Sequence, residues 1–249
     1  MTTSSIRFYG ELNDFLAPQS KHTTLSITLN DHPAVKGTIE SLGVPHTEVN
    51  IITVNGKSVD FSCQLADADR VHVYPCSLFP ETSPLIRLQP AITGAPRFVL
   101  DTHLGKLASY LRMLGFDALY QNDFTDDDLA GISNREDRYL LTRDRGLLKR
   151  SIVSRGYCIR STDPVQQILE VIKRFDLSSA IRPFRRCLIC NGELVRIEKE
   201  EILDRLEPET KKYCKEFFIC MQCGKVYWKG SHYQRMRQFF QQLLERNIN

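Results

Sequence analysis

The sequence lacks the features that would place the chain in a membrane or outside a globular fold. No stretch approaches the roughly 18 apolar residues that a membrane span needs. The first residues, Met-Thr-Thr-Ser-Ser-Ile-Arg, lack the charged start and apolar run of a secretion signal. Glycine and proline are scarce, at 13 and 11 in 249 residues, which excludes a disordered or fibrous protein. We therefore expect a cytoplasmic, globular protein without a membrane partner.

The chain also has little excess charge, but that excess is unevenly placed. Against 33 Lys and Arg stand 30 Asp and Glu, a net charge of +3. Residues 1–96 carry 6 basic and 9 acidic residues, whereas residues 182–249 carry 14 and 9. If the chain has a polyanionic partner, that partner is expected to contact the C-terminal end. With about 150 residues in a typical domain, 249 residues predict one large or two to three small domains.

Residues 1–79 mix one helical pattern with short extended runs. The runs cover 6–9, 25–29, 49–54 and 71–74, a helix is expected through Val35 and Ile39, and Asn55-Gly56 predicts a hairpin turn. One helix among such strands predicts an α+β domain of the ubiquitin-like, β-grasp kind. Prolines then recur at 80, 84, 90 and 96, so residues 80–96 are expected to form a linker.

Residues 97–181 alternate between strand and helix patterns. Apolar runs at 98–100, 118–120, 139–141 and 157–159 are separated by helical patterns, which predicts an α/β domain with a parallel sheet. Residues 182–249 contain paired cysteines and end in a basic amphipathic tail at 232–246.

Acidic residues follow the predicted strands of this α/β domain. Asp101 ends the run at 98–100, Asp144 follows the run at 139–141, and Asp126 begins the helix between them. Ligands of open α/β sheets bind beyond the carboxyl ends of the strands. Clustered carboxylates suit magnesium or manganese, so hydrolysis of a phosphodiester is expected, with Asp123 as a helper. The structural alternative is that these aspartates cap helices or lie in solvated turns.

Basic residues surround these acids and suit the phosphates of a substrate. The candidates are Lys106, Arg112, Arg143 and Arg145. Exposed Lys and Arg more often only solvate a surface, and Lys106 and Arg143 are favoured because they flank Asp101 and Asp144. Asp163 is left out, because Asp163-Pro164-Val-Gln166 is typical of a helix capping box.

Four of the eight cysteines form two Cys-x-x-Cys pairs. They are Cys187-Leu-Ile-Cys190 and Cys220-Met-Gln-Cys223, with 29 residues between them. Four thiolates at this spacing predict a structural zinc site, whereas a redox dithiol needs only one pair. His232 is interpreted as a phosphate contact or a packed ring rather than as a zinc ligand.

The pattern of residues 97–240 resembles the Mut-seven C-terminal RNase family. The matching motifs are Phe98-Val-Leu-Asp-Thr-His-Leu-Gly-Lys106, Leu140-Leu-Thr-Arg-Asp144 and the two cysteine pairs followed by Val226-Tyr-Trp-Lys-Gly-Ser-His232. The resemblance implies a PIN-like nuclease domain with a zinc ribbon. It implies Asp101, Asp126 and Asp144 as the acids of the site. A further acid that PIN nucleases often carry is replaced here by Gly146, so three carboxylates are expected.

Residues 5–79 resemble the β-grasp domain that precedes this module and are similar to small sulfur carriers. The matching stretches are Ile39-Glu-Ser-Leu-Gly-Val-Pro-His-Thr-Glu48 and Val54-Asn-Gly56. The carriers end in a free Gly-Gly, whereas this segment continues into Tyr74-Pro-Cys-Ser-Leu-Phe-Pro80, so sulfur transfer is not expected. The domain is instead interpreted as a docking module for a protein partner.

The sequence thus predicts three parts: a β-grasp domain, a PIN-like domain and a zinc ribbon with a basic helical tail. The expected activity is metal-dependent hydrolysis of RNA, with zinc as a structural metal and magnesium or manganese as the catalytic one. The alternative is a non-catalytic RNA-binding or ribosome-associated adaptor. In that case the acids would be remnants and the zinc ribbon would bind RNA.

Overall fold

The structure of the chain is a computed structural model that describes residues 2–29, 31–81, 83–90, 92, 94–231, 233, 234 and 238. The chain divides into two compact units. The first unit comprises Met1–Ala91 and Thr125–Cys158, and the second comprises Ile92–Phe124 and Ile159–Asn249. No helix of the described residues is long and apolar enough to span a bilayer.

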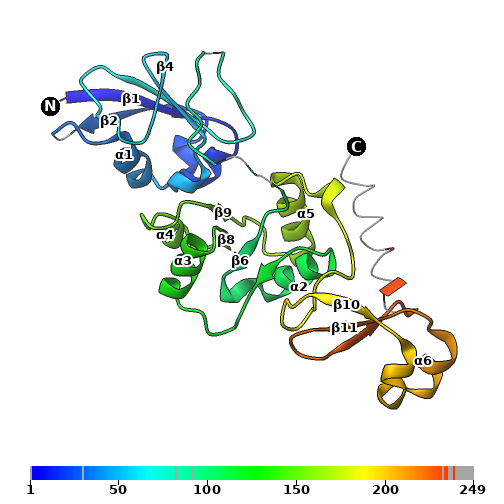
Figure 1. The fold of residues 1–249 in the computed structure, drawn as a ribbon. Coiled ribbons are helices and arrows are strands. Elements are labelled where there is room, and N and C mark those ends of the chain that lie inside the picture. The colour runs from blue at the N-terminus through cyan, green and yellow to red at the C-terminus, as the bar shows by residue number, and fades with distance from the viewer. Residues whose placement is uncertain are drawn as a thin grey trace. The chain divides into compact units, whose positions relative to one another are not determined.

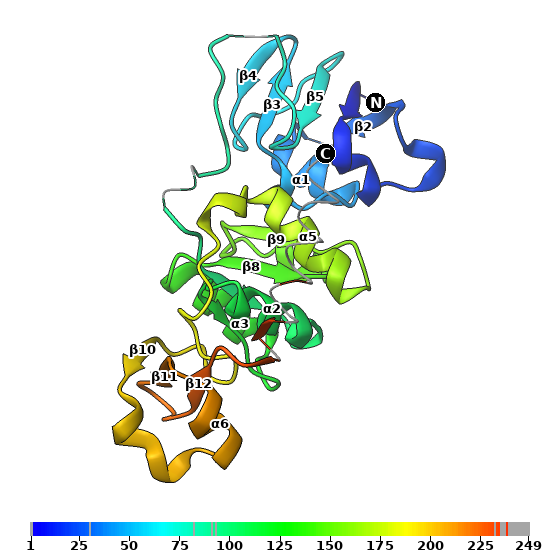
Figure 2. The ribbon, with the colours of Figure 1, turned by 90° about the vertical axis from the view of Figure 1, so that its right-hand side faces the viewer.

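The N-terminal part of the first unit is a five-stranded mixed sheet with one α-helix (Figure 1). Its strand order is β2-β1-β5-β3-β4, in which β1 and β5 are parallel and the other pairs are antiparallel. Figure 2 shows β3, β4 and β5 side by side. The elements are β1 (Thr2–Phe8), β2 (Thr24–Leu29), α1 (Val35–Ser41), β3 (Ile51–Val54), β4 (Lys57–Val59) and β5 (Arg70–Tyr74).

Alternating apolar residues produce this N-terminal sheet domain, as the sequence predicted. Ile6 and Phe8 of β1 lie in the core with Val71 and Val73 of β5, and Ile39 of α1 is also fully buried. Asn55 and Gly56 both have positive φ angles, 50° and 80°, which a two-residue hairpin turn requires. Three short 3₁₀ helices complete this part: η1 (Gly10–Phe15), η2 (Pro18–Ser20) and η3 (His46–Glu48).

The first unit also contains two parallel strands with helices. Strand β8 pairs with β9 in parallel, and all residues of both strands are buried. A strand buried on both faces is a continuous apolar run rather than an alternating one, which is the pattern of residues 139–142. The elements are α3 (Asp126–Arg135), β8 (Tyr139–Thr142), α4 (Arg145–Leu148) and β9 (Gly156–Cys158).

The second unit contains a further parallel pair and two helices. Strand β6 pairs with β7, and α2 packs against α5. The rings of Phe98 and Phe175 meet edge to face in this core, with centroids 5.2 Å apart. The elements are β6 (Phe98–Leu100), η4 (Thr102–Leu104), α2 (Gly105–Met113), β7 (Ala118–Leu119), α5 (Pro164–Arg174) and η5 (Ser178–Ala180). The parallel strands predicted for residues 97–181 are therefore present.

Residues 182–231 of the second unit form what we call the four-cysteine region, drawn from yellow to orange in Figure 2. Its antiparallel strands have the order β10-β11-β12. Ile202, Leu206 and Phe217 form its small apolar core. The elements are β10 (Leu194–Ile197), η6 (Lys199–Arg205), α6 (Pro208–Tyr213), β11 (Phe217–Cys220) and β12 (Val226–Trp228). His232 and most of the predicted basic tail lie outside the described residues.

The proline-rich segment 80–96 contains no helix or strand among its described residues. It is nevertheless fixed to the first unit by hydrogen bonds. Leu88 N donates to Asn50 O over 2.8 Å, and Gln89 Nε2 donates to Val49 O over 2.8 Å and to His46 O over 3.1 Å. This part of the predicted linker is therefore attached to the N-terminal sheet domain.

Candidate metal centre and acidic residues

Four cysteines gather at one place in the four-cysteine region. The Sγ atoms of Cys187, Cys190, Cys220 and Cys223 all lie within 4.8 Å of one another. The Sγ atoms are 3.6 Å apart for Cys187 and Cys223 and 3.4 Å apart for Cys190 and Cys220. Tetrahedral zinc with bonds of about 2.3 Å would place sulfurs about 3.8 Å apart. The arrangement therefore fits a four-thiolate metal centre.

Cys187 has the electrostatic setting of a metal-binding thiolate. Burial alone would raise its pKa, but hydrogen bonds from the backbone N–H of Cys190 and the hydroxyl of Tyr227 outweigh burial and lower the pKa to about 6. Tyr227 Oη lies 3.1 Å from Cys187 Sγ and accepts a hydrogen bond from Leu188 N over 3.1 Å. Tyr227 thus holds both the first sulfur and the turn that follows it.

Close backbone approach explains the residues that follow the first cysteine pair. A side chain at Gly192 would come within 2.8 Å of Cys220 Sγ, so glycine leaves the space in which the two pairs meet. Asn191 has a φ of 66°, a left-handed conformation that asparagine tolerates better than most residues. These two residues bring Cys190 close to Cys220.

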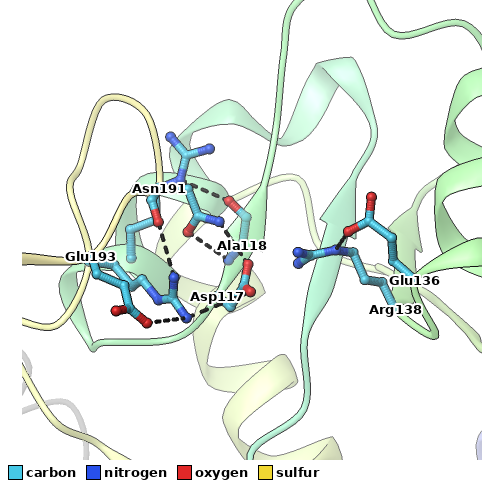
Figure 3. A network of polar contacts seen from close by, with 8 residues as sticks. Asp117, Ala118, Glu136, Arg138, Asn191 and Glu193 are labelled. Atoms are coloured by element: carbon cyan, nitrogen blue, oxygen red, sulfur yellow. Dashed lines mark hydrogen bonds and ion pairs between the residues drawn. The ribbon is translucent and has the colours of Figure 1, made fainter. Parts of the chain in front are cut away.

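Asn191 also attaches the cysteine turn to the strand β7. Its Oδ1 accepts a hydrogen bond from Ala118 N over 3.0 Å, and its Nδ2 donates to Asp117 Oδ1 over 2.7 Å (Figure 3). Arg186 lies between the carboxylates of Asp117 and Glu193, at 3.7 Å and 3.9 Å. The cysteine turn is therefore held by a polar network of Asp117, Ala118, Arg186 and Glu193, all in the second unit.

Arg112, expected to bind substrate, has a structural role instead. Arg112 is only 3% exposed, and its guanidinium donates hydrogen bonds to backbone carbonyls of the second unit. Nε donates to Ala118 O over 2.8 Å, while NH1 donates to Leu188 O and Ile189 O over 3.1 Å and 2.9 Å. Burial lowers the pKa of Arg112, and the nearby thiolates of Cys187 and Cys190 oppose this effect. These contacts occupy the donors that a phosphate would need.

Asp101 directly follows β6 and precedes η4. Its carboxylate is half-buried, and Oδ1 accepts a hydrogen bond from Thr102 Oγ1 over 3.2 Å. Lys106, one turn further along the chain in α2, is exposed. Asp123 is exposed in the turn after β7.

The three aspartates that begin α3 have different surroundings. Thr125 and Asp128 form a reciprocal capping box, in which Asp128 N donates to Thr125 Oγ1 over 3.2 Å and Thr125 N to Asp128 Oδ2 over 3.0 Å. The hydrogen bonds from Thr125 lower the pKa of Asp128. Asp127 forms an ion pair with Arg150. Asp126 makes neither of these contacts and is exposed at the first position of the helix.

Asp144 is the N-cap of α4, two residues beyond β8. Its Oδ1 accepts hydrogen bonds from Gly146 N over 2.6 Å and from Leu147 N over 3.3 Å. The residue remains exposed, as does Arg143 before it. Asp144 therefore caps a helix, and its carboxylate is at the same time exposed to solvent. The convergence of the predicted acids on one metal ion stays a prediction.

Arg145 lies beside Asp144, but its side chain contacts the N-terminal sheet domain of the same unit. NH1 donates to Phe15 O over 3.0 Å, NH2 donates to Asp14 O over 3.3 Å, and the guanidinium lies 5.0 Å from the centre of the Phe15 ring. Arg138 of this unit is likewise occupied, since its Nε donates to Glu136 Oε2 over 2.7 Å (Figure 3). Lys106 and Arg143 are exposed and make none of the contacts described for Arg112 and Arg145.

Two family models match different parts of the chain. A model described as the Mut7-C RNAse domain matches residues 96–240, more than half of the sequence. The chain belongs to this family. A model described as Mut7-C ubiquitin matches residues 1–78, so the N-terminal sheet domain is the ubiquitin-like domain of a Mut7-C protein, as its resemblance implied.

Other comparisons add little to the family match. No curated protein matches the chain. Among solved structures, the small archaeal modifier protein 1 of H. volcanii is 13% identical and aligns with 30% of this chain and 98% of its own, with a TM-score of 0.25.

Sequence reasoning missed Arg112 and Tyr227 as supports of the cysteine centre. Both act on residues that are far away in the sequence: Arg112 on Leu188 and Ile189, and Tyr227 on Cys187. An arginine in the apolar stripe of the helix 105–113 was a usable signal, because a buried guanidinium needs carbonyl or carboxylate partners. For Tyr227 the sequence offers no comparable signal.

Proposed function

We propose that the chain is a ribonuclease that hydrolyses phosphodiester bonds of RNA. The observation that carries the proposal is the match of residues 96–240 to the Mut7-C RNAse domain. The positions of Asp101 and Asp144 support it, because each follows a parallel strand, β6 and β8, at its carboxyl end. We infer that residues 97–181 are a PIN-like domain in which these acids, with Asp126, form the catalytic site.

In this site the carboxylates of Asp101, Asp126 and Asp144 would hold magnesium or manganese, with Asp123 as a helper. The exposed carboxylates of Asp126 and Asp144 are hard oxygen ligands that remain open to solvent, which suits such a partly hydrated cation. When bound, the cation would neutralise charge on the phosphate and lower the pKa of attacking water. Lys106 and Arg143 would position the phosphate, while the capping contacts of Asp144 hold its carboxylate in one rotamer.

We further infer that the cysteine centre is a zinc ribbon with a structural metal. The four sulfurs would fill all four ligand positions of a tetrahedral ion and leave none for water or substrate. The ubiquitin-like domain is proposed to dock a protein partner, and RNA is the proposed substrate.

The test compares two aspartates that each cap a helix. Asp144 caps α4 and Asp163 caps α5, each by accepting two backbone N–H groups. Asparagine caps helices as well as aspartate does, so both Asn variants should fold. We expect Asp144→Asn to lower cleavage of single-stranded RNA by at least about a hundredfold and Asp163→Asn to leave it unchanged. Cleavage of a labelled RNA is measured in dialysed protein with magnesium, with manganese and with neither.

A second matched pair lies at the start of α3. Asp126→Asn should reduce cleavage as Asp144→Asn does, whereas Asp127→Asn should remove only the surface ion pair with Arg150. RNA binding should be retained in all four variants. Equal cleavage by the parent protein and Asp144→Asn under every metal condition would mean that the activity belongs to a contaminant. The adaptor alternative would then be the better explanation.

A further inference from the structure

A basic, aromatic hollow is lined by residues of the four-cysteine region and by Tyr233, and no cysteine is among its described lining residues. Its volume is about 530 Å³, within the range of about 300–1,000 Å³ that is usual for ligand sites. Its ring-bearing and basic lining residues are Phe184, Phe218 and Tyr233, and Arg185, Arg196 and Lys229. No acidic residue is among the described residues that line it.

The rings form a connected apolar surface that is only half-buried. Phe184 and Phe218 are stacked, with centroids 4.9 Å apart and planes inclined by 28°. The ring of Tyr233 packs against that of Phe184, with centroids 4.6 Å apart and planes inclined by 58°. Rings left partly exposed beside one another offer a flat surface on which a further planar group can stack.

The backbone of Phe184 has an unfavourable conformation. Its φ is 61°, in the left-handed region that bulky side chains rarely adopt. Such a conformation costs free energy and persists where the surrounding structure requires it. A large ring thus lines the hollow at a backbone position that glycine or asparagine would adopt more easily.

The cations surround this aromatic surface. Lys229 Nζ lies 6.0 Å from the ring centroid of Phe184 and 5.9 Å from that of Phe218, and Arg185 and Arg196 are exposed. Glu216 pairs with Lys229 at 2.5 Å, and this hydrogen bond lowers the pKa of Glu216. Glu216 also attracts Arg196, but no carboxylate is among the described lining residues, so the hollow with Arg185, Arg196 and Lys229 around it favours an anion.

We propose that this hollow binds a nucleotide of single-stranded RNA. The base stacks on the surface of Phe184 and Phe218, and the flanking phosphates contact Arg185, Arg196 and Lys229. Stacking reads no sequence, because every base has a π-face, so the site holds the strand without selecting a target. Only the choice of RNA rests on the proposed ribonuclease function; the nucleotide itself follows from the rings and charges.

The experiment measures binding of a fluorescein-labelled single-stranded RNA to the full chain by anisotropy, without magnesium or manganese. Phe218→Leu keeps an apolar side chain but removes the ring, and we expect it to weaken binding about tenfold. Lys229→Gln should weaken binding and reduce the slope of log K against log salt by about one. Quenching of a 2-aminopurine base in the RNA, which reports stacking on a ring, should be lost in Phe218→Leu.

The matched control is a second aromatic and lysine pair in the same region. Tyr213 is 67% exposed, and Lys212 Nζ lies 5.1 Å from its ring centroid, but neither lines the hollow. Tyr213→Leu and Lys212→Gln should bind RNA like the parent protein. Zinc content and circular dichroism confirm that each variant is folded.

The outcomes separate this inference from the proposed activity. Unchanged RNA affinity and quenching in Phe218→Leu, or an equal loss in Tyr213→Leu, would overturn the nucleotide site even if cleavage is intact. Equal competition by duplex RNA would also overturn it, because paired bases cannot stack on the rings. Loss of binding in the hollow variants of a protein that never cleaves RNA would support the site and contradict the ribonuclease proposal.

Discussion

At the scale of single residues, Arg112 of α2 connects the turn between Cys187 and Cys190 to the strand β7. Its donors end on Ala118 O of β7 and on two carbonyls between Cys187 and Cys190. A lysine has no planar fork and could not reach both directions at once. These three hydrogen bonds explain why a charged arginine lies in the buried stripe of α2.

We expect Arg112→Leu to lower the free energy of unfolding of the second unit by about 3 kcal/mol. The substitution removes the buried guanidinium and leaves the Ala118, Leu188 and Ile189 carbonyls without this donor. Urea unfolding of the full chain measures the change, and the rate of zinc loss to a chelator should rise. Arg143→Leu, at an exposed position, serves as the control and should unfold like the parent protein.

At the scale of elements, the short helix η3 joins the ubiquitin-like domain to β9 within the first unit. Glu48 Oε1 accepts a buried hydrogen bond from Cys158 N over 2.6 Å, and His46 Nε2 lies 2.8 Å from Val153 O. Glu40 Oε1, at 2.7 Å from His46 Nδ1, orients the imidazole ring. Lys149 Nζ adds a hydrogen bond to Glu40 O over 2.6 Å. Polar contacts thus tie the two parts of this unit together.

Glu48→Ala should destabilise this junction by about 2 kcal/mol, because the buried Cys158 N–H would lose the acceptor that Glu48 provides. Glu48→Gln keeps an oxygen at the same place and should cost less. Hydrogen exchange of the full chain should show faster exchange at β9 in Glu48→Ala, while the amides of β1 and β5 keep their protection. Equal exchange in the Ala and Gln variants would show that the contact does not stabilise the junction.

Local patterns predicted the elements well and their contacts poorly. The strand at 98–100 and the start of the helix at Pro164 were confirmed as predicted, because apolar runs and caps act over a few residues. The capping box predicted at Asp163 was wrong in one detail. The backbone N–H of Asp163 donates to Ser161 Oγ over 3.1 Å rather than to the side chain of Gln166. The cysteine centre was predictable from spacing. The contact of Glu48 with Cys158 crosses 110 residues of chain, which no local pattern can indicate.

At the scale of the whole molecule, stability differs in origin between the parts. The ubiquitin-like domain has a core of fully buried residues such as Ile6, Ile39 and Val73, whereas the three-stranded sheet of the four-cysteine region packs on Ile202, Leu206 and Phe217. So small an apolar core contributes little by itself, and a metal usually supplies the remainder.

We expect one zinc ion per chain by elemental analysis, and its removal should unfold the four-cysteine region. Structural zinc sites contribute about 10–16 kcal/mol of apparent binding free energy. Limited proteolysis after chelation should therefore cut between residues 187 and 228 and leave the ubiquitin-like domain whole. Cys187→Ser should give the same fragments without a chelator. Zinc-free protein that resists protease throughout this region would contradict the structural role of the metal.

The junction at η3 also has a consequence for folding while the chain is being synthesised on the ribosome. His46, Thr47 and Glu48 are 6%, 0% and 3% exposed, but the strand that covers them ends only at Cys158. At about 5–20 residues per second, roughly 4–17 s pass between the end of β5 at Tyr74 and the end of β9 at Cys158. During this interval the nascent ubiquitin-like domain presents an imidazole and a carboxylate to water instead of a bare apolar patch. Because this surface is polar, the ubiquitin-like domain exposes little aggregation-prone apolar surface before β9 is synthesised.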